Sequence, residues 1–152
     1  MLSFVAHYGA HVAKSTTRCS LEDVALRAVR ASRRDTALAR MLPVFLWRAR
    51  GRLDLRKLTT KAVLKDCAAP LGYFLELASK LGSFTGFDGA LAALRAHARP
   101  ESPTYFFPHT SRGPLESTAV DEMTPEDARR WGLLTGTPTD SFESYFRKVA
   151  HL

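Results

Sequence analysis

Apolar residues recur three and four positions apart along most of the first hundred residues of this chain. This is the spacing of one buried face of an α-helix. After Ser20 the residues of such a stripe are Leu21, Val24, Ala25, Ala28 and Val29. We find no strand pair, and a short strand is expected only at 104–107. The sequence therefore predicts an all-α fold, a helical bundle of about five helices with a loop-rich C-terminal extension carrying one or two short helices.

Helix-start and helix-stop residues divide this pattern into separate helices. Ser20 with Asp23 resembles a capping box, Asp35 suits an N-cap, and Pro70 suits a first helical position. Pro43 lies inside an apolar stripe, where it should either kink the helix or start a second short one. The predicted bundle helices span residues 20–34, 35–51, 54–66, 70–81 and 88–98, and those of the extension span 125–131 and 140–149.

Charge and composition divide the chain into two parts. Residues 18–65 carry 13 lysines and arginines against four acidic residues, whereas residues 101–152 carry five against eight. Prolines interrupt the chain from residue 100 onward. We therefore predict a basic helical bundle at 1–99 and a Pro-rich, aromatic, mildly acidic extension at 100–152, packed on the same domain.

No motif for catalysis, a metal or a cofactor is found. Phosphate-binding, nucleophile-elbow and zinc-protease signatures are absent from the sequence. His7 and His11 stand four apart, but no further ligand lies near them, and Cys67 follows Asp66, whose charge disfavours a thiolate. We expect no enzyme, no cofactor and no metal, although an enzyme with a dispersed site stays open as a third hypothesis.

The chain shows no targeting or membrane signal. Residues 1–14 are partly apolar but lack a basic start and a continuous apolar run, and no stretch approaches the roughly 20 apolar residues of a membrane span. Two cysteines, Cys19 and Cys67, are too few for a disulfide scaffold. We expect a cytoplasmic protein with no membrane contact.

The excess of arginine in the front half gives the first functional hypothesis. Phosphate backbones favour such surfaces because binding releases counterions. We predict a small non-enzymatic binding protein whose basic helical face contacts nucleic acid. The predicted contact residues are Arg27, Arg30, Arg33, Arg34, Arg48, Arg50 and Arg52. The alternative is a basic surface produced by arginine-rich coding bias. A helix-turn-helix over 60–81 is disfavoured because the second helix is too apolar to read bases.

Aromatic residues in the extension give the second hypothesis. Large aromatic side chains act as anchors in protein interfaces. The chain would then be an accessory subunit, similar in role to an antitoxin, that docks a protein partner through its extension. The predicted partner-binding residues are Tyr105, Phe106, Phe107, Phe142, Tyr145 and Phe146. The other interpretation is that these rings fold back onto the chain's own bundle.

Overall fold

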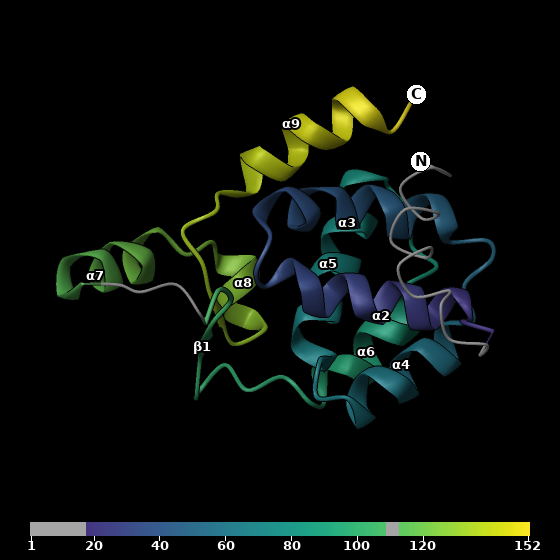
Figure 1. The fold of residues 1–152 in the computed structure, drawn as a ribbon, viewed down its shortest axis with the longest axis horizontal. Helices are drawn as coiled ribbons and strands as arrows, with labels where there is room; N and C mark the ends of the chain where they lie inside the picture. Colours follow the sequence, from purple (N-terminus) through teal and green to yellow (C-terminus); the bar gives the residue numbers. More distant parts are fainter. Residues whose placement is uncertain (1–17, 109–112) are drawn as a thin grey trace.

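The computed structural model describes residues 18–108 and 113–152, and this part of the chain forms eight α-helices and one pair of two-residue strands. The predicted all-α bundle is confirmed (Figure 1). The predictions made for residues 1–14, including His7 and His11, lie outside the described residues. The bundle helices are α2 (Leu21–Ser32), α3 (Thr36–Ala49), α4 (Leu55–Leu64), α5 (Ala68–Leu81) and α6 (Asp88–Arg95).

Side-chain caps begin the first three of these helices. The Ser20 side chain accepts from the Asp23 N–H while the Asp23 carboxylate accepts from the Ser20 N–H, which completes the predicted capping box. Asp35 and Asp54 accept from backbone N–H groups in the first turns of α3 and α4. Pro43 lies within one continuous α3, so it does not divide that helix. Packing of α3 against α2, α5 and α9 offsets the backbone hydrogen bond that proline removes.

Helix α5 forms the centre of the core. Every residue from Leu71 to Ala78 is buried, and α5 packs against α2, α3, α4 and α6. This burial excludes α5 as the recognition helix of a helix-turn-helix, because that helix must present polar side chains to base edges. The predicted first residue, Pro70, lies in the third position, and α5 begins at Ala68.

The C-terminal part packs on the same core. Strand β1 (Thr104–Tyr105) pairs in parallel with β2 (Leu133–Leu134), a pairing that the sequence analysis did not predict. Phe106, Trp131 and Phe142 belong to the same cluster of buried residues as the bundle helices. The Trp131 Nε1–H donates to Glu76 Oε2 of α5 at 2.9 Å, so a buried polar pair also joins the two parts.

The remaining helices differ in how they pack. Helix α8 (Glu126–Arg130) is short, with five residues. Helix α9 (Thr139–Val149) lies along α3, and its Phe146 is buried beside Val44 of α3. Helix α7 (Pro114–Met123) was not predicted, and it has no buried residue. It projects from one side of the body, away from α4 (Figure 1).

Candidate functional site

Two adjoining cavities open between the bundle and the C-terminal part. The larger has a volume of about 800 Å³ and lies among the end of α2, the α4–α5 turn, the loop after α6 and the Trp131–Leu133 segment. The smaller, of about 720 Å³, lies between the end of α2 and the α4–α5 turn. Both are lined by Arg33, Asp66, Pro70 and Pro108, so they form one continuous depression. We call it the basic cleft.

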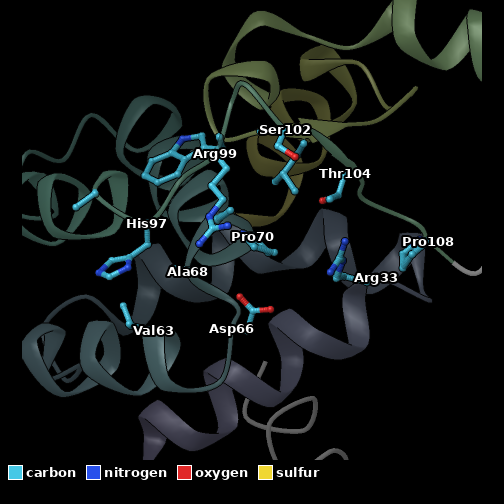
Figure 2. Close-up of a pocket in the computed structure, with 15 residues that line it drawn as sticks. Arg33, Val63, Asp66, Ala68, Pro70, His97, Arg99, Ser102, Thr104 and Pro108 are labelled. Carbon is cyan, nitrogen blue, oxygen red and sulfur yellow. The ribbon is translucent and has the colours of Figure 1, made fainter.

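Among the charged residues that line the basic cleft, cations outnumber carboxylates. Its charged residues are Arg30, Arg33, Arg34, Lys65 and Arg99, against the single carboxylate of Asp66. His97 stands beside them on the wall of the larger cavity. Figure 2 shows Arg33, Asp66 and Arg99 entering the cavity from three separate segments. Like charges around a hollow surface concentrate a positive potential there, which attracts anions.

Arg33 forms part of the wall as well as the lining. Its Nε donates to the Phe106 carbonyl at 2.9 Å and its Nη2 to the Tyr105 carbonyl at 2.8 Å. Burial lowers the pKa of this guanidinium, and the charge of Asp66 opposes that shift. Because a guanidinium has five N–H groups, these two bonds leave others that can turn toward a ligand.

Glycine at position 132 allows the outer wall to close. Gly132 has a φ of +71°, and a Cβ there would lie 2.5 Å from the Arg99 carbonyl oxygen. Its own carbonyl accepts from the Thr104 N–H at 3.0 Å. The loop that carries Arg99 is therefore held directly against the strand pair, because only glycine tolerates both this conformation and this approach.

Asp66 occupies the floor of the basic cleft in an unusual backbone conformation. The φ of Asp66 is +53°. The Asp66 N–H donates to the Val63 carbonyl, and the Cys67 N–H donates to the Ala62 carbonyl. This is a Schellman ending of α4, in which glycine usually takes the left-handed position. Burial raises the pKa of the neighbouring Cys67 thiol, although Arg30 and Lys65 oppose the shift, so this cysteine is not an activated nucleophile.

The seven predicted arginines do not gather at one place. Arg30, Arg33 and Arg34 reach the basic cleft, and Arg27 lies one turn earlier on the same side of α2. Arg52 follows α3, whose end lies beside the start of α2, since the Asp54 N–H donates to Glu22 at 2.7 Å. The length of α2 separates the two groups by roughly 16 Å.

Two more of the seven, Arg48 and Arg50, lie outside the basic cleft and bind other parts of the chain. Arg48 Nη2 donates to the carbonyls of Val149 and Ala150 at 2.6 and 3.1 Å, which places a cation at the C-terminus of α9. The guanidinium of Arg50 lies 4.3 Å from the centroid of the Trp47 ring, and its Nη1 donates to the backbone carbonyl of Trp47. Trp47 is therefore already covered on one face and does not offer a stacking surface there.

Half of the six predicted partner-binding aromatics lie in the interior. Phe106, Phe142 and Phe146 are buried, and the rings of Phe106 and Phe142 each make an edge contact with Phe74 of α5. The other three, Tyr105, Phe107 and Tyr145, are partly exposed. As folded, the chain uses the buried rings to attach its own extension.

Sequence reasoning missed Asp66 and Arg99 as parts of this site. Arg99 begins the Pro-rich segment and has no neighbouring motif, so nothing local marks it. Lys65 belonged to the recognised basic run, and a left-handed Asp after a helix has no reliable sequence signal. Within the described ranges, no cluster of three or more His, Cys, Asp or Glu residues could hold a metal ion.

No helix in residues 18–108 and 113–152 has the length and apolar run needed to cross a bilayer. Comparisons with protein-family models, curated proteins and solved structures give no match to this chain.

Proposed function

We propose that this protein is a non-enzymatic nucleic-acid-binding module that holds phosphate groups in the basic cleft and along the adjacent side of α2. The contact residues of this proposal are Arg30, Arg34, Lys65 and Arg99 in the basic cleft, with Arg33 in its wall, and Arg27 on the adjacent side of α2. The observation that carries the proposal is the convergence of five cationic side chains, from two helix ends and a distant loop, around one cavity with a single carboxylate.

The structural roles of the acidic residues in the basic half support this proposal. Asp35 and Asp54 cap helices, and Glu22 is buried, where the Asp54 N–H lowers the pKa of its carboxyl. Asp23 belongs to a capping box and pairs with Lys61 at 2.7 Å. These carboxylates hold the fold together, and among the described residues no carboxylate forms an ion pair with Arg27, Arg30 or Arg99, which favours an external anion.

A phosphate backbone fits this surface better than a small anion. The cationic groups extend from Arg27 past Arg30 and Arg34 to Arg99, over two adjoining cavities. A polyanion can occupy such a line at several points, and each neutralised phosphate releases counterions. Contacts of this type position a nucleic acid without selecting its sequence.

The salt dependence of binding gives a direct test. If five phosphates are neutralised, duplex affinity falls roughly 500-fold between about 50 and 200 mM salt, since the logarithmic slope is about −0.9 per phosphate. Fluorescence anisotropy with a labelled DNA duplex and a labelled single-stranded RNA would measure this slope. No binding at the lower salt concentration would refute the proposal.

Matched charge-reversal variants separate the basic cleft from net charge. Arg30→Glu with Arg99→Glu changes the charge by the same amount as Arg40→Glu with Lys148→Glu, and all four side chains are exposed. The cleft variant should lose most of its affinity for nucleic acid. The slope of log affinity against log salt should become shallower by the amount that corresponds to about two phosphate contacts. Equal losses in both variants would show attraction to net charge alone, and would overturn the assignment to the cleft. Circular dichroism confirms folding of each variant.

A further inference from the structure

Exposed apolar side chains are concentrated on α4 and α7. Val63 lines the larger cavity of the basic cleft, whereas Leu64, Leu115 and Met123 lie outside the proposed nucleic-acid site. Among the residues that the structure describes, five large apolar side chains are exposed. Two of them, Val63 and Leu64, end α4, and two others, Leu115 and Met123, lie on α7. Leu64 is 80% exposed and Leu115 is 86% exposed, so neither is covered by the part of the chain that the structure describes.

The apolar stripe of α7 is bordered by acidic residues. Leu115, Ala119 and Met123 are four residues apart and therefore line one side of the helix. By the same helical geometry, Glu116 and Glu122 stand on the two borders of that stripe. The helix contains no lysine or arginine. It thus presents a narrow apolar line with a negative charge on each side.

The outward side of α4 carries the opposite charge. Leu64 lies there at the C-terminal end of the helix, in line with Lys57 two turns earlier, and Arg56 and Lys57 are both exposed. No acidic residue occurs from Leu55 to Leu64. The outward side of α4 therefore combines an exposed leucine with exposed cations, and its charge is opposite to that of the acidic residues bordering the apolar line of α7.

The two surfaces cannot meet within one molecule. The C-terminal half of α7 is fixed to the body because the Tyr105 hydroxyl donates to the Asp121 carboxylate and Arg129 donates to the Asp121 carbonyl. From that anchor α7 projects away from α4, which lies on the opposite side of the molecule (Figure 1). The α4 surface can therefore meet α7 only when the two helices belong to different copies.

We propose that α7 of one copy docks on the outward side of α4 of a second copy, and that the second copy returns the same contact. A two-fold dimer repeats each contact twice and then closes. Such repetition is needed because a specific interface buries about 1,200 Å² or more in total, which exceeds what one pair of ten-residue helices supplies. Leu64 of one copy and Leu115 of the other belong to each contact.

The molecular mass of the full chain in solution tests the proposal. At micromolar protein concentrations, light scattering after size-exclusion chromatography should give a molecular mass of twice 16.9 kDa. Leu64→Glu or Leu115→Glu should raise the dimer dissociation constant at least about tenfold, because each buries a charge against an apolar centre. Arg40→Glu, an exposed change on α3, is the control and should leave the dimer intact. A monomeric wild-type chain would overturn the proposal.

Exchanging the signs of the charges on α7 and α4 gives a second test, in which the expected result is a gain of binding rather than only a loss. One variant carries Glu116→Lys with Glu122→Lys, and the other carries Arg56→Glu with Lys57→Glu. Each alone should be monomeric, since α7 and α4 then have the same sign, whereas an equal mixture should form a heterodimer through two attractive contacts. Dimers of either variant alone, or a mixture that stays monomeric, would show that these helices do not meet and would overturn the proposal.

Discussion

Replacement of Asp66 separates two roles that the structure gives to one position. The residue ends α4 in a left-handed conformation and places the only carboxylate in the basic cleft. An L-residue in this conformation costs about 1–2 kcal/mol, with Asp and Asn at the lower end because their side chains bond locally. Glycine avoids that cost but loses about 0.4–1 kcal/mol to the greater freedom of the unfolded chain.

Stability should therefore follow the backbone. We expect Asp66→Gly to be between neutral and about 1 kcal/mol more stable than the wild type. Asp66→Asn should be nearly neutral, and Asp66→Ala about 0.5–1 kcal/mol less stable because alanine has neither the freedom of glycine nor a local hydrogen bond. Urea denaturation followed by circular dichroism measures these differences.

Affinity for nucleic acid should instead follow the charge. A carboxylate about 8 Å from a bound phosphate repels it by roughly 0.5 kcal/mol in a water-like dielectric, which is a factor of two to three in affinity. All three variants should therefore bind a DNA duplex about two to three times more tightly than the wild type, whatever their stability. Weaker binding by Asp66→Asn, or affinities that rank as the stabilities do, would refute this reasoning.

Three further changes test the packing and electrostatics of the fold. Gly72→Ala should destabilise the protein by about 3 kcal/mol in urea denaturation, because the new Cβ would lie 2.2 Å from the Trp131 ring. Tyr73→Phe should be neutral or up to about 1 kcal/mol stabilising in the same assay, because the buried Tyr73 hydroxyl has no hydrogen-bond partner among the described residues. A lower stability would mean that a bound water satisfies that hydroxyl. Hydrogen bonds from Lys61 and Ser20 hold the pKa of the Asp23 carboxyl far below its usual value, so the stability from this group is present above pH about 4 and is lost as the pH falls toward the lowered value. Acid titration of unfolding should therefore show a smaller loss between pH 4 and 2 in Asp23→Asn, and identical curves would contradict this assignment.

Local signals in the sequence predicted the bundle well. The capping residues Ser20, Asp35 and Asp54 begin helices where expected, because a cap depends only on side chains within three or four positions. Pro43 shows the limit of that reasoning. Its effect on α3 depends on how tightly neighbouring helices hold the chain, and those contacts come from distant segments.

The C-terminal part was harder to predict because its order comes from non-local contacts. The β1–β2 pair joins residues about thirty positions apart, and two residues per strand leave no alternating pattern to detect. Helix α7 carries only a short stripe of Leu115, Ala119 and Met123, which is narrower than the apolar faces on which the prediction relied, and none of its side chains is buried. Its start does carry a signal, Pro114 in the first turn with Glu116 accepting from the Gly113 N–H.

The arginines show why a count of charges did not locate the candidate site. In the sequence, Arg30, Arg33 and Arg48 are equivalent, because each follows the apolar stripe of a predicted helix. The fold places two backbone carbonyls beside Arg33 and two others beside Arg48, and both pairs come from segments more than seventy residues away. A guanidinium that reaches such carbonyls contributes to the fold, whereas one that projects into a hollow with other cations favours an external anion. The cationic density that matters for function is therefore set by the tertiary fold, and it includes Arg99, which lies far from the basic run in sequence.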